Sequence, residues 1–173
     1  RKTCGAEQAA YVSGCAGGGS NLAGLSFPFI RELIAGNCTT KIVAVEPASC
    51  PSMTEGEFRY DYGDVAHTTP LMKMYTMGAD FVPDPIHAGG LRYHGMAPMV
   101  SHAHHLGLLQ SIALPQETTF KAGRLMARTE GIVPAPESTH ALAGELLEAR
   151  KHLGTPGSAP TCVSGLSRHG VWS

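Results

Sequence analysis

The sequence predicts an α/β fold in which helices flank a parallel β-sheet. Residues 9–15 (AAYVSGC) form a short apolar run that is typical of a buried strand. A glycine-rich stretch and a predicted helix over 22–35 follow, and residues 41–46 (KIVAVE) form a second β-branched run closed by Pro47. A strand, a glycine loop, a helix and a second strand in this order make a βαβ unit, the building block of parallel sheets.

The first predicted helix, over 22–35, has a clear end and one internal complication. Gly36 and Asn37 supply a stop signal after its last apolar residues. Pro28 lacks a backbone N–H, so it must lie in the first turns of this helix or kink it.

The second half of the chain predicts two more helices and a short strand. One helix covers 116–130 and stops at Gly131. The other covers 139–153, and Ser138 is a suitable N-cap. Residues 161–165 form a weak terminal strand, which would add to the same sheet.

Residues 47–100 differ from their surroundings. They are rich in Pro, Gly, Tyr, Met and Asp and show little periodicity. A loop of this length without structure is uncommon inside a compact domain. We therefore expect this segment to form an irregular lid or mobile subdomain over a site.

Composition excludes several classes of protein. The 173 residues are 43% hydrophobic and 16% charged, which is enough apolar material for one real core. The net charge of −1 and the lack of a basic stripe argue against a nucleic-acid partner. No apolar run is long enough to span a membrane. The five cysteines are odd in number and form no CxxC pair, which favours reduced thiols in a cytoplasmic protein.

A candidate metal site is suggested by three neighbouring histidines, His102, His104 and His105. On a helix they lie at i, i+2 and i+3, so their rings do not converge on one ion. We therefore expect no metal site.

The stretch GCAGGGSN, residues 14–21, carries the strongest functional signal. Glycines have no Cβ atoms, so the backbone N–H groups of Gly17–Gly19 can converge on one ligand. The start of the following helix adds about half a positive charge. The sequence therefore predicts an anion site, most simply for a phosphate.

The glycine loop alone does not decide between several known types of site. A mononucleotide P-loop is excluded because no GK[ST] follows the glycines. The dinucleotide pattern fits poorly, because Leu22 stands where its third glycine belongs, although Glu46 lies where a ribose-binding acid would. A tight strand-to-helix turn without a ligand is the third alternative.

Four stretches resemble the β chain of tryptophan synthase, most closely its longer β-like branch. They are GCAGGGSNLAG, AVEPASCPSMTEGEFRYDYGD, TPLMKMYTMGADFVPDPIHAGGLRYHGMAP and ARTEGIVPAPESTHA, in this order. The resemblance implies a fold-type-II pyridoxal-phosphate enzyme, of which residues 1–173 would be the C-terminal portion, incomplete at the N-terminus. It implies condensation of L-serine with indole to L-tryptophan and water, a homodimeric full-length protein, and a tryptophan synthase α subunit as a possible partner.

The resemblance also implies roles for individual residues. Gly17, Gly18, Gly19, Ser20 and Asn21 match the loop that holds the phosphate of pyridoxal 5'-phosphate. Glu130, in TEGIVPAPES, matches the catalytic glutamate of the family, which transfers a proton as hydroxide leaves and stabilises charge on the attacking indole. Ser167 matches the serine that hydrogen-bonds the pyridine nitrogen. The segment His87–Pro98 matches part of the mobile domain that closes over the substrate.

The sequence departs from the family in two places. The family's Schiff-base lysine lies upstream of the glycine loop in a Ser-His-Lys motif, and no lysine here has that context. Arg168 stands beside Ser167 where the family has glycine. We therefore expect the chain alone not to catalyse β-replacement. A non-catalytic remnant that binds phosphate or a partner chain, and a serine or threonine dehydratase, remain alternatives.

Overall fold

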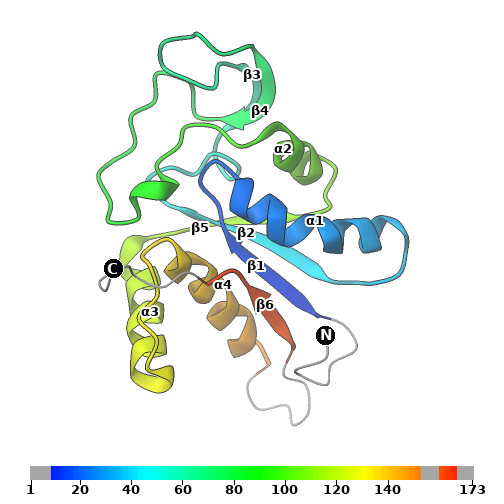
Figure 1. Ribbon diagram of the computed structural model, residues 1–173, viewed down its shortest axis with the longest axis vertical. Helices are drawn as coiled ribbons and strands as arrows, with labels where there is room; N and C mark the ends of the chain where they lie inside the picture. The colour runs from blue at the N-terminus through cyan, green and yellow to red at the C-terminus, as the bar shows by residue number, and fades with distance from the viewer. Residues whose placement is uncertain (1–8, 153–159, 167–173) are drawn as a thin grey trace.

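The computed structural model describes residues 9–152 and 160–166 (Figure 1). The elements in chain order are β1 (Tyr11–Cys15), α1 (Ser20–Ile34), β2 (Lys41–Pro47), β3 (Glu57–Asp61), β4 (Met72–Thr76), the 3-10 turn η1 (Gly89–Leu91), α2 (Pro98–His105), β5 (Gln110–Leu114), α3 (Gln116–Glu130), α4 (Ser138–Arg150) and β6 (Cys162–Ser164). Among the described residues, no helix combines the length and apolar character needed to cross a membrane.

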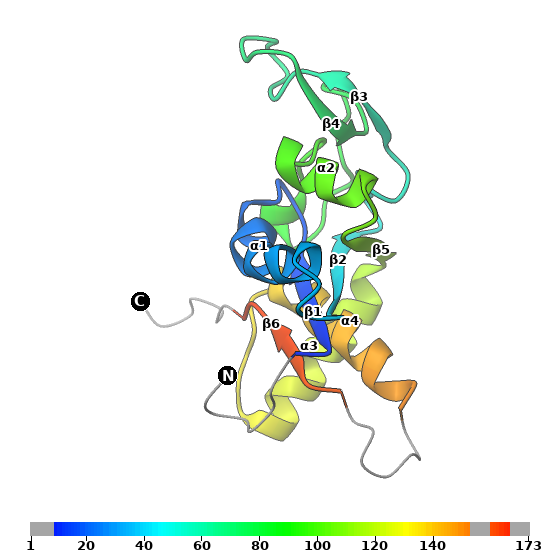
Figure 2. The same ribbon diagram turned by 90° about the vertical axis from the view of Figure 1, so that its right-hand side faces the viewer.

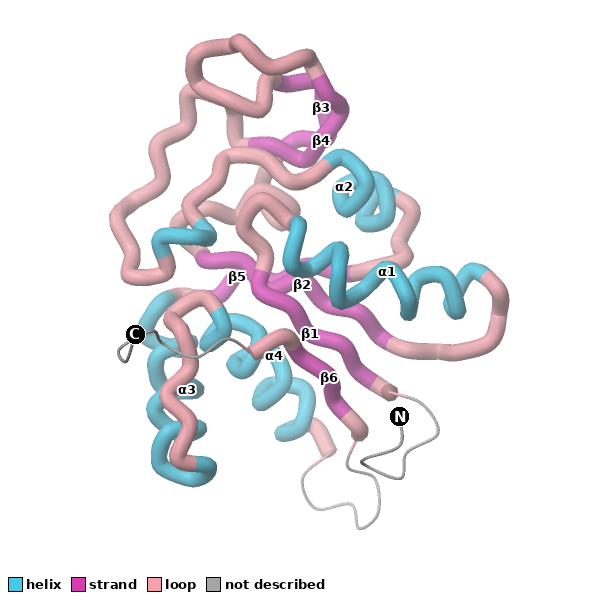
Figure 3. The backbone as a smooth tube through the Cα atoms, in the orientation of Figure 1, coloured by secondary structure: helices cyan, strands magenta, loops and turns pink. Residues whose placement is uncertain are grey.

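The main sheet has four parallel strands in the order β5–β2–β1–β6 (Figure 3). Tyr11 pairs with Lys41 and Cys15 with Val45, so β1 and β2 run side by side over the whole length of β1. This arrangement confirms the predicted α/β fold with a parallel sheet and flanking helices. The weak terminal strand is β6, which pairs with β1 at the edge of the sheet.

Helices cover both faces of the sheet (Figures 1 and 2). Successive side chains of a strand point to opposite faces. Val12, Ile42 and Ala44 therefore pack with residues of α1 in one core cluster. The other face of β1 and β2 packs against α4, where Ser13 Oγ donates to the Ala141 carbonyl at 3.0 Å. The close approach of α4 needs Gly144, because a Cβ there would lie 2.8 Å from Val45 Cγ2.

The β3–β4 hairpin lies beyond the carboxyl ends of the sheet (Figure 1), whereas Met53, Met96 and Val100 pack into the core cluster of β1 and α1. Strands β3 and β4 form an antiparallel hairpin, which lies at the top of Figure 1. The chain then returns through η1 to α2, and Met77 N donates to the His94 carbonyl at 2.8 Å along this return. The hairpin is therefore held by pairing between two short strands, although its sequence shows no clear hydrophobic periodicity.

Several predicted boundaries shift in the structure. Helix α3 covers the predicted range, but α4 begins at Ser138 and ends at Arg150. Glu137, not Ser138, is the N-cap of α4, and the Glu137 side chain makes no capping hydrogen bond. Pro28 lies in the middle of α1, which continues past it to Ile34. Strand β5 was not predicted, because its half-buried sequence QSIAL has too short a run of apolar residues.

Candidate functional site: a glycine-loop pocket

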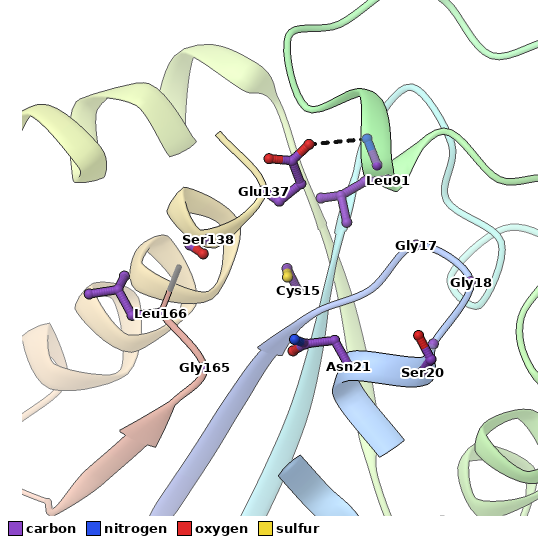
Figure 4. A pocket seen from close by; sticks show the side chains of 12 residues that line it. Cys15, Gly17, Gly18, Ser20, Asn21, Leu91, Glu137, Ser138, Gly165 and Leu166 are labelled. Atoms are coloured by element: carbon purple, nitrogen blue, oxygen red, sulfur yellow. Dashed lines mark hydrogen bonds between the residues drawn. The ribbon is translucent and has the colours of Figure 1, made fainter. Parts of the chain in front are cut away.

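A pocket of about 440 Å³ lies at the carboxyl ends of β1 and β6 (Figure 4). The glycine loop and the start of α1 form one wall, and the start of α4 faces them. Gly90 and Leu91 of η1 close a third side, and residues 165–166 after β6 complete the rim. Ligands of open parallel sheets bind at this end of the strands.

The glycine loop is shaped by close contacts that side chains would prevent. A Cβ on Gly17 would lie 2.6 Å from the Gly90 carbonyl oxygen. Gly19 has φ of 96°, a conformation that side chains disfavour, and a Cβ there would lie 2.5 Å from Met96 Sδ. At both positions the fold requires glycine, which explains two of the three consecutive glycines.

The loop presents N–H groups that need an acceptor. Within residues 9–152 and 160–166, the N–H groups of Gly17, Gly18 and Gly19 donate to no protein atom. Helix α1 begins directly after them without a side-chain cap, so the orphan donors of its first turn are left open at its positive end. Among the described lining residues there is no Lys, Arg or His. An anion here would be held by backbone donors and helix dipoles.

A second helix begins at the same pocket. Ser138, the first residue of α4, is buried and lines the wall opposite Ser20. The positive ends of α1 and α4 therefore meet across one cavity. This convergence strengthens the preference of the pocket for an anionic ligand.

Glu137 is the acidic residue of the pocket. Its side chain is half-buried, and its Oε1 accepts a hydrogen bond from Gly90 N at 3.1 Å (Figure 4). Sequence reasoning missed this residue, although it lies in the same stretch, TEGIVPAPES, as Glu130. The available signal was its position directly before the predicted N-cap Ser138, because helix N-termini at the carboxyl end of a parallel sheet face the ligand.

Glu130, the predicted catalytic residue, does not line this pocket. It is the last residue of α3, is exposed to solvent, and borders a separate apolar hollow between α3, α4 and β6. The turn at residues 131–137 carries the chain from that hollow to the glycine-loop pocket. Glu130 and Glu137 therefore border different cavities, and the catalytic role expected of Glu130 stays a prediction.

The remaining predicted site residues are only partly placed. Ser20 and Asn21 line the pocket, and a Cβ on Gly165 would lie 3.2 Å from Asn21 Oδ1. Ser167 lies outside the described residues, as does Arg168. The residues directly before them, Gly165 and Leu166, line the pocket, so the strand β6 leads toward it.

Comparison with known proteins identifies the family. Residues 2–164 match the model of a family described as pyridoxal-phosphate dependent enzyme. The chain belongs to the family of pyridoxal-phosphate-dependent enzymes. This match confirms the predicted fold-type-II relationship and the predicted cofactor.

Relatives within this family carry a more specific name. The tryptophan synthase β chain of Fervidobacterium nodosum is 55% identical over 161 residues, which are 93% of this chain and 37% of the relative. Tryptophan synthase β chain 2 of Aquifex aeolicus is 50% identical over an alignment of 173 positions, which covers 96% of this chain and 40% of the relative. The resemblance to tryptophan synthase β chains is thus confirmed, and the chain spans about two-fifths of the length of these relatives.

The pocket fits the phosphate of pyridoxal phosphate. The cofactor phosphate is an anion, and within the described part of the chain the N–H groups of Gly17–Gly19 have no protein acceptor. No lysine lines the pocket among the described residues. This part of the pocket therefore fits the phosphate end of the cofactor and supplies no amine for its aldehyde.

The position of Glu46 argues against a dinucleotide-binding site. Its carboxylate is fully buried and accepts hydrogen bonds from Ser52 Oγ at 2.9 Å and Met53 N at 2.8 Å, and two more from Thr54. Burial raises the pKa of Glu46, and these hydrogen bonds oppose that rise. Since Ser52, Met53 and Thr54 all belong to the loop after β2, the Glu46 carboxylate shapes that loop and does not face a ribose.

Two of the α2 histidines, His104 and His105, contact neighbouring segments, whereas His102 is exposed to solvent. His104 Nδ1 lies 3.0 Å from the Leu109 carbonyl oxygen, and the His105 ring stacks on Phe58 with 4.4 Å between centroids. No group of three potential metal ligands occurs within the described part of the chain. Cys15, Cys38, Cys50 and Cys162 are free thiols, and burial raises the pKa of Cys15 at the pocket wall.

Proposed function

We propose that this chain forms the C-terminal part of a pyridoxal-phosphate-dependent lyase that condenses L-serine with indole to give L-tryptophan and water. One observation carries the proposal: a glycine loop whose N–H groups donate to none of the described residues opens at the positive ends of two helices, in a chain 55% identical to a tryptophan synthase β chain. The natural full-length protein would act as a homodimer in the cytoplasm, with an α subunit as a possible source of indole.

Each part of the pocket has a distinct task in this proposal. When bound, pyridoxal phosphate supplies an electron sink for the bonds of the amino acid that react. Gly17–Asn21 bind its phosphate through backbone N–H groups and fix its orientation. Gly90 and Leu91 cover the cavity beside the loop and limit access of water. Ser167 is proposed to hydrogen-bond the pyridine nitrogen.

We assign the acid–base role expected of Glu130 to Glu137. The Glu137 carboxylate lines the same cavity as the phosphate loop, whereas Glu130 borders another hollow. One carboxylate oxygen of Glu137 is held by Gly90 N, which leaves the other oxygen to take or give a proton. A proton given by this oxygen to the hydroxyl of serine would let that group leave as water.

A chimera tests the proposal directly. Residues 9–166 of this chain would replace the matching segment of the Fervidobacterium nodosum β chain, which supplies the remaining part of the fold. We expect the purified chimera to form tryptophan from L-serine and indole, and the 173-residue chain alone to form none. The same chimera carrying Gly19→Ala is the matched control and should lose cofactor binding.

The chimera also separates the alternatives. A serine or threonine dehydratase would release pyruvate or 2-oxobutyrate and form no tryptophan when indole is added. A non-catalytic remnant would give a folded chimera that neither binds pyridoxal phosphate nor forms either product. Either outcome would refute the proposed β-replacement.

A further inference from the structure

Tyr93 lies between the glycine loop and the loop of the β3–β4 hairpin. A Cβ built on Gly18 would meet Tyr93 Cδ1 at 3.5 Å and Cε1 at 4.0 Å, so the aromatic ring lies directly over Gly18. At the far end of the ring, the Tyr93 hydroxyl donates a hydrogen bond to the Gly63 carbonyl. One side chain thus contacts both loops.

The hairpin loop that receives this hydrogen bond is internally braced. Gly63 N donates to Thr69 Oγ1 at 2.7 Å, and Thr69 Oγ1 donates in turn to Asp64 Oδ1 at 2.8 Å. The Asp64 carboxylate also accepts from Thr68 N at 3.1 Å and Thr69 N at 3.0 Å. Because these bonds close residues 63–69 into one unit, a displacement of Gly63 involves the whole loop.

The segment that carries Tyr93 is also tied to the glycine loop through its backbone. Ala97 N donates to the Gly18 carbonyl at 2.9 Å, and Cys50 Sγ donates to the Tyr93 carbonyl at 3.1 Å. His94 Nε2 lies 2.8 Å from the Tyr62 carbonyl oxygen, on the buried side of the same segment. These bonds hold the backbone of Tyr93 in place. A shift of Gly18 against the ring would therefore move the hydroxyl that binds Gly63.

We propose that Tyr93 is a positioning residue that links the conformation of Gly18 in the phosphate loop to the order of residues 63–69. The inference rests on the proposed function in that it takes the glycine loop as a phosphate site. An anion bound at Gly17–Asn21 holds Gly18 against the ring, and the hydroxyl then holds Gly63. By reciprocity, an ordered 63–69 loop holds the ring over Gly18 and strengthens anion binding.

The experiment is a titration of the full 173-residue chain with inorganic phosphate, followed by amide resonances in NMR spectra. In the unaltered chain we expect phosphate to shift the amides of Gly17–Asn21 and, at the same midpoint, those of Gly63, Thr68 and Thr69. Tyr93→Phe keeps the ring and removes only the hydroxyl. It should abolish the response of the hairpin loop and weaken phosphate binding about three- to tenfold, the effect of one lost hydrogen bond.

Tyr60→Phe is the matched control. Tyr60 lies on β3 in the same hairpin, is 64% exposed, and contacts Lys73 through its ring. Removing the Tyr60 hydroxyl should change neither the response of the hairpin amides nor the affinity for phosphate. If the hairpin amides respond in Tyr93→Phe as in the unaltered chain, or stay silent in the unaltered chain while the glycine loop responds, the coupling is refuted.

A second variant keeps the coupling testable if phosphate does not bind. Absence of any response at Gly17–Asn21 would contradict the phosphate site of the proposed function. Gly18→Val then presses a branched side chain onto the Tyr93 ring without phosphate, at a glycine whose φ is not positive. The Gly63 and Thr69 resonances should shift in this variant and not in Gly18→Val combined with Tyr93→Phe. No shift in the single variant refutes the coupling, and unchanged β1 and β2 resonances show that the fold is intact.

Discussion

Glu137 Oε1 accepts a hydrogen bond from Gly90 N at 3.1 Å, which joins the start of α4 to the segment after the hairpin (Figure 4). The two residues are 47 positions apart in the chain and meet only at the rim of the pocket. The bond places a carboxylate inside the cavity and fixes the backbone that covers it. It connects the segment that was predicted to be mobile to the start of α4.

The first prediction separates the two glutamates of TEGIVPAPES. Glu137→Gln keeps an acceptor oxygen for Gly90 N and removes the titrating carboxylate. In the chimera we expect kcat for tryptophan formation to fall about 10²–10⁴-fold, the usual contribution of general acid–base catalysis. Glu130→Gln is the control and should stay within about twofold of the parent, because Glu130 is exposed outside the pocket. A large loss in the control with none in Glu137→Gln would restore the role to Glu130.

The second prediction concerns the glycine with positive φ. Gly19→Ala introduces a Cβ at φ of 96°, 2.5 Å from Met96 Sδ, and should destabilise the chain by about 1–3 kcal/mol. Gly24→Ala is the matched change inside α1, where a Cβ meets nothing within 4 Å. It should stabilise by about 0.5–1 kcal/mol, because alanine favours helix. Urea unfolding measures both, and equal effects of the two changes would contradict the strained loop.

The third prediction tests the buried carboxylate of Glu46. Glu46→Gln replaces one acceptor oxygen by an amide donor that faces the donors of Ser52, Met53 and Thr54. We expect a loss of about 2–4 kcal/mol in the free energy of unfolding, because buried donors lose their acceptor. Glu55→Gln, at an exposed position of the following turn, should change it by less than about 0.5 kcal/mol. A neutral Glu46→Gln would show that the loop does not depend on this carboxylate.

The fourth prediction is a pH dependence caused by Glu145. Burial raises the pKa of Glu145 above its ordinary value of 4.5, and a hydrogen bond with Ser164 opposes the rise. A raised carboxyl pKa favours folding below the unfolded pKa, and this contribution is lost as pH rises through the folded pKa. Glu145→Gln should therefore be more stable than the parent at pH 8 and nearly equal to it at pH 4. A constant difference across this range, measured by urea unfolding, would contradict the raised pKa.

The sequence predicted the β1–α1–β2 unit well because its signals are local. The apolar runs at residues 9–15 and 41–46 set the two strands, and the glycines between the first strand and the helix set the loop. The helix at 116–130 was predicted to its last residue, because Gly131 adopts the left-handed conformation that ends it. Such features depend on neighbouring residues and can be read without the rest of the fold.

The hairpin β3–β4 and strand β5 could not be predicted in the same way. Neither β3 (EFRYD) nor β5 (QSIAL) contains a continuous apolar run in its sequence. In the structure most of their side chains are half-buried or exposed. Both depend on pairing with a partner strand, β4 in one case and β2 in the other. Pairing between distant segments is a property of the folded chain.

The sequence by itself determined the parallel α/β core, the position of the glycine loop and the family of the chain. Only the tertiary structure decided that Glu137 lies in the pocket while Glu130, seven residues earlier, lies outside it. It likewise decided that Glu46 is buried against its own loop. The physical reason is that a loop's backbone geometry follows from local glycines, whereas the direction and burial of an acidic side chain depend on how α3, α4 and the sheet pack together.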